Sequence, residues 1–170
     1  MAKSQFMIKR DPADCSLFYL ALDKKPALVA LYKAVKNEAL FKFLKNDFTQ
    51  SRWKTAALKN AFALIGCQKF EQAAAFFILG GSFKDAINVI LNKLQDYQLA
   101  LLLARLLEGE EGSLVKMIIE EHILPWSEKI KDNFLSSVGK WILKDYEGSL
   151  RELVKKEEHQ HPSTLHYFNF

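Results

Sequence analysis

Histidines and cysteines are the residues of this 170-residue chain whose types could do chemistry. His159, His161 and His166 stand close together near the C-terminal end, after two adjacent glutamates. Histidine and glutamate are zinc ligands, but a zinc site needs ligands held in fixed positions by rigid elements. This stretch has no helical or strand periodicity, so we expect no metal site there.

The remaining candidates for catalysis lack partners in the sequence. Cys15 and Cys67 form no CxxC pair and suit buried thiols better than a disulfide framework. A cysteine nucleophile needs a nearby base, and nothing in the sequence brings His122 to either cysteine. Gly80-Gly81-Ser82 follows a helix, not a strand, and lacks the lysine of a phosphate loop. Acidic pairs such as Glu110-Glu111 are adjacent, and adjacent residues do not face each other on a helix. We therefore expect no catalytic residue, no cofactor, no metal and no enzyme.

The elements that would position these residues are helices. Apolar residues make up 49% of the chain and charged residues 26%, as in ordinary globular proteins. Seven glycines and four prolines leave little turn chemistry for a many-stranded protein, and apolar residues recur at helical spacing. The longest uncharged apolar run, 73–81, is too short to span a bilayer. The polar N-terminal segment lacks the apolar core of a signal peptide, so we expect a cytoplasmic, all-α chain.

Capping residues predict where several helices begin and end. Asn37 and Asp96 are expected to cap the helices that follow them, and Ser51 to cap a longer one ending at Gly66. Ser82 is expected to form a capping box with the acid three residues on.

The C-terminal third is expected to hold three further helices. One begins at Ser113 and ends at Pro125, a longer amphipathic one covers 126–146, and a short one covers 150–156. We expect a single helical domain over 1–156 and a poorly periodic tail over 157–170.

Alanine-rich helix centres recur along the middle of the chain. Ala57, Ala73, Ala86 and Ala100 are 16, 13 and 14 residues apart, which gives a helix pair of about 30 residues. Alanine allows neighbouring helix backbones to approach closely, with phenylalanines such as Phe62 filling the gaps. This spacing predicts an α-solenoid of stacked helical hairpins, with about 8–10 helices. An irregular orthogonal helix bundle is the alternative.

Positive charge is concentrated in the first half of the chain. Residues 1–85 carry 14 Lys and Arg against 7 Asp and Glu, and residues 86–170 carry 10 against 13. This asymmetry favours an acidic partner at the N-terminal half, although the lysines could also simply solvate outer helix faces. No stretch interleaves arginines with stacking aromatics, so we expect no nucleic acid. The candidate partner-binding basic patch comprises Lys33, Lys36, Lys42, Lys45, Arg52 and Lys54.

Specific stretches of this sequence resemble one protein family. They include the run RWKTAALKNA at 52–61, the run AAAFF at 73–77, and LGGS followed by KDA within 79–86. Together with flanking pieces that begin at Asp11-Pro12, they span roughly 11–125. This region resembles the large subunit of the RAVE complex, also called the DmX-like or rabconnectin family.

The resemblance implies a function that the residue pattern alone does not. Members of that family are very large scaffold proteins with β-propellers followed by a helical region, to which this chain would correspond. The fungal complex reassembles the V-ATPase from its V1 and Vo sectors. The implied partners are peripheral-stalk subunits of V1, a smaller RAVE subunit and a Skp-type adaptor, at vacuolar and endosomal membranes. A coat-like or tether-like solenoid in vesicle trafficking is the alternative.

Overall fold

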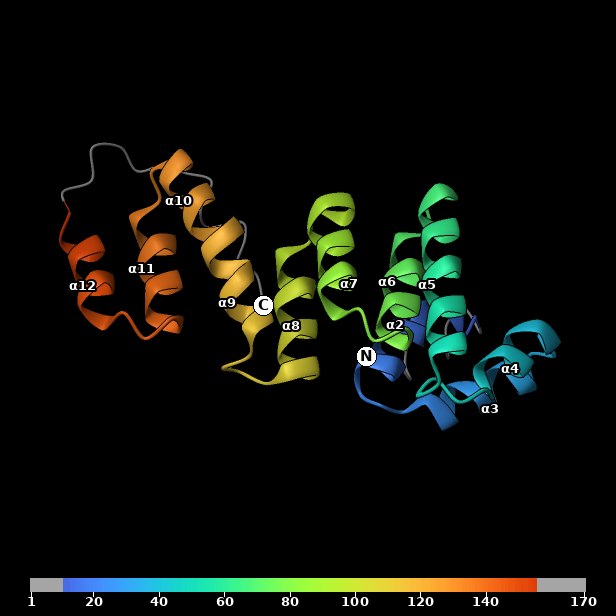
Figure 1. The fold of residues 1–170 in the computed structure, drawn as a ribbon. Coiled ribbons are helices and arrows are strands. Elements are labelled where there is room, and N and C mark those ends of the chain that lie inside the picture. The colour runs from blue at the N-terminus through green and yellow to red at the C-terminus, as the bar shows by residue number, and fades with distance from the viewer. Residues whose placement is uncertain (1–10, 156–170) are drawn as a thin grey trace. The chain divides into compact units, whose positions relative to one another are not determined.

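The computed structural model describes residues 11–155, and the regular structure in that range is entirely helical (Figure 1). No strand occurs among these residues, so the all-α prediction is confirmed. The chain divides into two compact units, one ending at Glu110 and the other beginning at Glu111. A single domain over 1–156 stays a prediction, because this division does not test whether the units unfold together. The tail expected over 157–170 lies outside the described residues.

The first unit, which we call unit 1, is built from short helices joined by tight turns. Its helices are α2 (Ala13–Ala21), α3 (Lys25–Ala34), α4 (Glu38–Leu44), α5 (Ser51–Gly66), α6 (Phe70–Leu79), α7 (Phe83–Val89) and α8 (Tyr97–Glu108). A π-helical turn, η1 (Ile90–Leu94), extends α7. Among residues 11–155, no helix has the length and apolarity that crossing a membrane requires.

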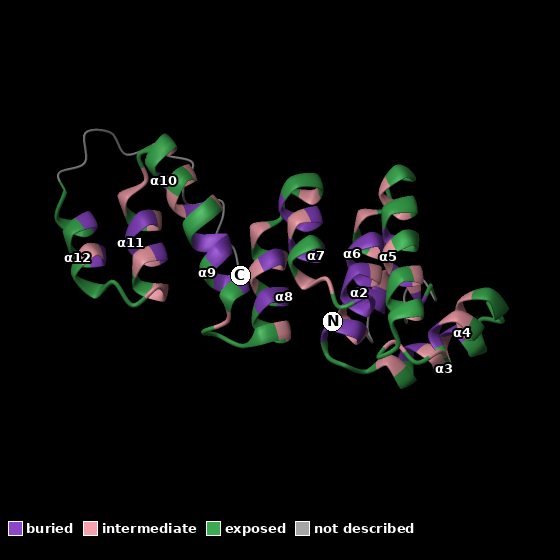
Figure 2. Ribbon diagram, in the orientation of Figure 1, coloured by how far each residue is buried: buried purple, intermediate pink, exposed green. Residues whose placement is uncertain are grey.

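Helix α6 forms the centre of unit 1. It packs against α5, α7 and α2, and Figure 2 shows it largely buried. Ala73, Ala74 and Ala75 are all fully buried. Consecutive residues point about 100° apart on a helix, so three in a row are buried only when neighbours approach from several sides. Alanine permits that approach, which agrees with the close packing expected at these positions.

The other side chains expected in the seams divide into two groups. Ala57 and Ala86 are fully buried, and Phe77 is 1% exposed. Phe62 was expected to fill a gap between helices, but it is 63% exposed and touches the Phe77 ring only at its edge, with centroids 5.1 Å apart. It follows Ala61 on α5, so it points away from the buried stripe of that helix.

The helix contacts of unit 1 extend beyond neighbours in the chain. Successive helices touch from α2 to α4 and from α5 to α8, as stacked hairpins require, but α2 also packs against α6 and α8. The stacked-hairpin solenoid therefore stays a prediction, and so does the alternative of an irregular orthogonal bundle.

The second unit, unit 2, contains one long interrupted helix followed by a helical hairpin. Its elements are α9 (Ser113–Ile118), the π-helical turn η2 (Ile119–Ile123), α10 (Leu124–Ile130), α11 (Asn133–Ile142) and α12 (Tyr146–Val154). The helix that begins at Ser113 was expected to end at Pro125, but it continues to Ile130. Pro125 lies in the first turn of α10, directly after the π-helical turn. A proline is tolerated there because its position does not demand an amide donor.

The two expected helices after Pro125 also differ from the structure. The amphipathic stretch over 126–146 is interrupted at Lys131, which has φ of 57°, and the Asp132 side chain caps α11. The last helix begins at Tyr146, four residues before the expected start, because Asp145 accepts a hydrogen bond from the Gly148 amide. Gly148 therefore lies within the helix and does not precede it.

Local capping chemistry predicts some helix starts correctly. Asn37 Oδ1 accepts from the Leu40 amide and Asp96 Oδ1 from the Leu99 amide, as expected. Ser51 is not a cap, because Gln50 holds the extended conformation before α5.

Ser82 occupies the expected cap position of α7, but the capping box does not form. Its hydroxyl donates to the Asp85 carboxylate, while its amide donates to the Phe77 carbonyl. The Asp85 carboxylate therefore cannot accept from the Ser82 amide, which a capping box requires.

Most turns between these helices share one left-handed residue, usually not a glycine. Gln68, Gln95 and Lys131 have φ between 55° and 58°. The amide of the next residue often donates a hydrogen bond to a carbonyl of the preceding helix. The Lys69 amide, for example, donates to the Leu64 carbonyl at 3.0 Å. This is the Schellman arrangement. Helix α5 ends at Gly66, as expected, and the left-handed residue of the turn that follows is Gln68.

The left-handed residues give a stability prediction. Replacing Gln95 (φ 55°) by glycine is expected to raise the free energy of unfolding by about 1 kcal/mol, since a residue with a Cβ is strained there. Replacing Lys93, a helical residue of η1, by glycine is the control and should cost about 1 kcal/mol. Urea denaturation followed by circular dichroism measures both, and a loss of stability in Gln95→Gly would contradict the strain argument.

Candidate interaction surface

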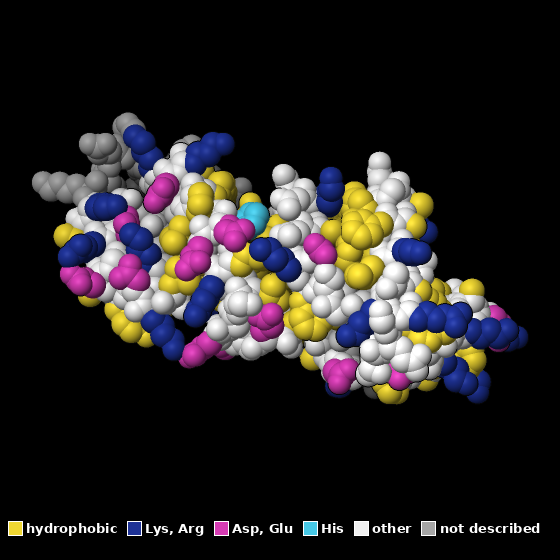
Figure 3. Space-filling model, in the orientation of Figure 1, with side chains coloured by type: hydrophobic (Ala, Val, Ile, Leu, Met, Phe, Trp, Pro, Cys, Tyr) yellow, Lys and Arg dark blue, Asp and Glu magenta, His cyan; other side chains and the backbone are white. Residues whose placement is uncertain are grey.

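The six basic side chains predicted as a patch lie on α3, α4, their connection, the residue directly after α4 and the start of α5. We call Lys33, Lys36, Lys42, Lys45, Arg52 and Lys54 the basic surface. All six are exposed. Figure 3 shows Lys and Arg side chains gathered over α3, α4 and the lower part of α5, and Figure 2 shows α3 and α4 with exposed, intermediate and buried residues along the same helices. The predicted exposure is thus confirmed, whereas a binding role stays a prediction.

An aromatic cluster fixes α4 against the rest of unit 1. The Phe43 ring of α4 lies 6.2 Å from Trp53 of α5, 5.7 Å from Phe76 of α6 and 5.4 Å from Phe48 between centroids. Such aromatic pairs contribute about 0.5–1.5 kcal/mol beyond their burial. The surface that α4 presents is therefore positioned by these ring contacts.

A second contact holds the start of α3 to the segment after α4. Lys25 Nζ donates to the Asn46 carbonyl at 2.9 Å and lies 5.0 Å from the Phe48 centroid. The α3–α4 hairpin is thereby closed at the end opposite its connecting turn.

Three cations of the basic surface are held by neighbours on the chain. Lys45 Nζ lies 5.2 Å from the Phe41 centroid, and the Arg52 guanidinium lies 5.2 Å from the Trp53 centroid. Both are cation–π contacts, worth about 0.5–1 kcal/mol at exposed sites. Lys42 pairs with Glu38 at 3.7 Å, and both side chains are largely exposed. These contacts reduce the conformational freedom of the cations without neutralising the surface.

Few acidic groups oppose this charge. Residues 24–59 contain nine Lys and Arg but only Glu38 and Asp47 as acids, a net charge of +7. The amide and hydroxyl of Thr49 donate to Asp47 Oδ1 at 2.9 and 2.8 Å and hold the pKa of that carboxyl below its ordinary value. Asp47 therefore stays ionised, but the segment remains strongly positive.

The candidate catalytic groups do not assemble within residues 11–155. Cys15 is buried, its thiol donates to the Pro12 carbonyl at 3.2 Å, and burial raises the pKa of that thiol. Cys67, in contrast, is exposed, although the sequence predicts a buried thiol. No group of three or more His, Cys, Asp or Glu in the described range could hold a metal ion. His159, His161 and His166 lie outside that range.

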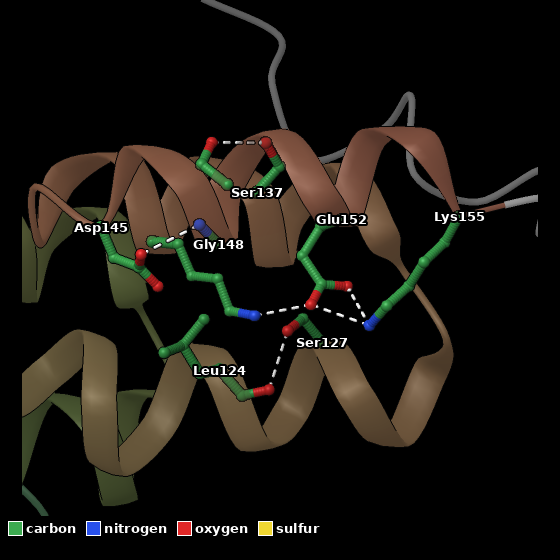
Figure 4. A network of polar contacts seen from close by, with 9 residues as sticks. Leu124, Ser127, Ser137, Asp145, Gly148, Glu152 and Lys155 are labelled. Atoms are coloured by element: carbon green, nitrogen blue, oxygen red, sulfur yellow. Dashed lines mark hydrogen bonds and ion pairs between the residues drawn. The ribbon is translucent and has the colours of Figure 1, made fainter.

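Unit 2 contains a polar seam that the sequence pattern does not predict. The hydroxyls of Ser137 and Ser149 are 2.8 Å apart, and Lys140 Nζ donates to Glu152 at 2.6 Å (Figure 4). Lys155 Nζ also donates to Glu152, which is only 6% exposed. Helices α11 and α12 therefore meet through small and charged side chains. Apolar periodicity could not reveal this contact, because the residues that make it are polar.

The seam makes the stability of unit 2 depend on pH. Hydrogen bonds from Lys140 and Lys155 hold the pKa of Glu152 below its ordinary value. A carboxyl with a lowered pKa in the folded state stabilises above its unfolded-state pKa of about 4.3, and this stabilisation is lost as the pH falls through the folded value. We expect urea denaturation of α11 and α12 to show this acid dependence. Glu152→Gln should reduce this acid dependence, whereas Ser149→Ala should not. If the free energy of unfolding of Glu152→Gln depended on pH as strongly as that of the wild type, Glu152 would not be its source.

Together these features define a class: an all-helical protein whose most distinctive surface in the described range is positively charged. Comparison with known proteins narrows this class. A sequence model of the family described as RAVE protein 1 C terminal matches residues 1–167. The chain belongs to this family, which confirms the resemblance read from the sequence.

The relatives are much longer proteins. Human DmX-like protein 1 is 41% identical over 192 residues, an alignment that covers 100% of this chain and 6% of the relative. Regulator of V-ATPase in vacuolar membrane protein 1 from Saccharomyces cerevisiae is 38% identical over 150 residues, or 86% of this chain and 11% of the relative. The protein of the same name from Schizosaccharomyces pombe is 34% identical over 149 residues, with 85% and 12% covered.

Proposed function

We propose that this chain is a non-catalytic protein-interaction segment of a V-ATPase assembly factor of the RAVE complex. It helps V1 rejoin Vo by binding protein partners, peripherally to vacuolar and endosomal membranes. Family membership supports this proposal, because two relatives carry names that make them regulators of V-ATPase in the vacuolar membrane. The implied partners are V1 peripheral-stalk subunits, the smaller RAVE subunit and a Skp-type adaptor.

The positive charge on α3, α4 and the start of α5 is the observation that supports a particular contact surface. A net +7 over residues 24–59, on side chains exposed at the basic surface, favours an acidic protein partner. Complementary charge accelerates association most at low ionic strength and orients the encounter. We therefore propose the basic surface as the contact for an acidic V1 subunit.

Charge reversal tests this contact. Lys42→Glu with Lys45→Glu is expected to slow association with isolated V1 about tenfold at low salt, with the difference shrinking as salt screens the charges. Lys116→Glu with Lys129→Glu, at exposed positions of unit 2, is the matched control and should change the association rate little. Stopped-flow or biosensor kinetics over a salt series measure both. If the wild type and both double variants associate with V1 at equal rates at every salt concentration, the basic surface is not the contact.

A further inference from the structure

The hairpin of α11 and α12 has its large apolar side chains on the outside. Six such residues on these helices are exposed: Phe134 61%, Trp141 57%, Tyr146 50%, Leu150 58%, Leu153 54% and Val154 81%. We call this set the apolar face. Figure 4 shows that the seam between the same two helices is occupied by polar groups.

This distribution reverses the usual amphipathic pattern. Ser137, Ser149 and Glu152 are buried where α11 meets α12, whereas leucines and aromatic rings meet water. Burial of apolar surface is the main driving force of folding and association, so a contiguous exposed apolar patch marks an interaction site. The hairpin resembles one half of a four-helix bundle.

Helical spacing places the apolar residues of α12 on one stripe. Tyr146, Leu150, Leu153 and Val154 are related by steps of three and four residues, which share a helix face. At one end of the stripe the Tyr146 ring meets the Trp141 ring of α11 edge-on, with centroids 4.9 Å apart. The stripe of α12 therefore continues onto α11 as one surface.

Three residues of the stripe are symmetric about Leu150, whereas the position equivalent to Leu153 is Glu147. Tyr146 lies four residues before Leu150 and Val154 lies four after it. Glu147 and Arg151, which pair with each other, are both highly exposed on the same helix. Their midpoint is one residue from Leu150, about 1.5 Å along the axis. An antiparallel copy of α12 about this axis would place Tyr146 opposite Val154 in both directions at once. Glu147 would then lie two residues, about 3 Å along the axis, from Arg151 of the other copy, a distance that the two long side chains can bridge.

We propose that the apolar face binds the same face of a second copy of this chain. The two hairpins pack antiparallel about a two-fold axis near Leu150 and form a four-helix arrangement. Self-complementary shape and charge of this kind are the property of an isologous interface, in which each contact occurs twice. In this dimer, Glu147 of each copy pairs with Arg151 of the other copy instead of with Arg151 of its own helix.

Sedimentation equilibrium of the full 170-residue chain over a concentration series tests the proposal. The wild-type chain should show a monomer–dimer equilibrium. Leu150→Glu should raise the dissociation constant at least tenfold, because the two-fold axis brings both new carboxylates together. Leu150 is exposed, so the variant should keep its helix content by circular dichroism. Phe62→Glu replaces an equally exposed apolar residue of unit 1 and should leave the dissociation constant unchanged.

Charge exchange separates this interface from non-specific apolar association. Glu147→Arg should weaken the dimer, because it places arginines opposite each other, and the double variant Glu147→Arg with Arg151→Glu should restore it. A wild-type chain that stays monomeric throughout the series would overturn the proposal. So would a dimer that Phe62→Glu weakens as much as Leu150→Glu does.

Discussion

Replacing Phe77 by alanine is expected to lower the free energy of unfolding of unit 1 by about 3–5 kcal/mol. The side chain is 1% exposed and lies on α6, which packs against three other helices. Removal of the ring loses its transfer free energy and leaves a cavity that helices held from several sides cannot collapse to fill. Urea denaturation, with hydrogen exchange to assign the loss to unit 1, measures the effect.

Phe62 provides the matched control for Phe77. Its ring touches Phe77 edge-on but is 63% exposed, so Phe62→Ala should cost about 1 kcal/mol, mainly through the lost aromatic pair. If Phe77→Ala cost no more than Phe62→Ala, α6 would not be the centre of the core.

Replacing Ala74 by leucine, or Ala57 by phenylalanine, is expected to cost about 1–3 kcal/mol. Both alanines are fully buried, on α6 and α5 respectively, and these two helices pack directly against each other. Extra methylene or ring atoms must push the helices apart or force strained rotamers. Thermal and urea denaturation of the two variants measure the loss.

Ala63 gives the control for these two substitutions. It lies on the exposed side of α5, so Ala63→Leu should change stability by less than about 0.5 kcal/mol. A negligible effect of both Ala74→Leu and Ala57→Phe would show that the alanines do not mark close helix contacts.

Much of the helical content could be predicted because its causes are local. The caps at Asn37 and Asp96 form as expected, since an acceptor two or three residues before free amides is sufficient. The burial of Ala57 and Ala86 follows from helical periodicity together with small side-chain size. These features depend on neighbours within one or two helical turns.

The errors occur where a turn or contact has no local signature. Lys131 adopts a left-handed conformation although it is neither a glycine nor an asparagine, so the sequence did not indicate a break there. Pro125 suggested a helix end, but the π-helical turn before it allows the chain to continue to Ile130. The polar seam at Glu152 depends on two helices meeting, which spacing within one helix does not encode.

The candidate surface was predictable in part. The exposure of all six basic residues follows from their positions outside the apolar stripes. The Phe41–Lys45 cation–π contact has an i, i+4 spacing that could have indicated it. The position of α4 could not be foreseen, because it depends on rings from Phe43, Trp53 and Phe76 that are distant in the sequence.

Crosslinking of this protein mixed with isolated V1, mapped by mass spectrometry, tests whether the basic surface binds V1. We expect Lys33, Lys36, Lys42, Lys45 and Lys54 to crosslink to acidic segments of V1 subunits, and high salt to abolish these products. If the two bind and the crosslinks to V1 come only from lysines outside 24–59, the basic surface is not the contact.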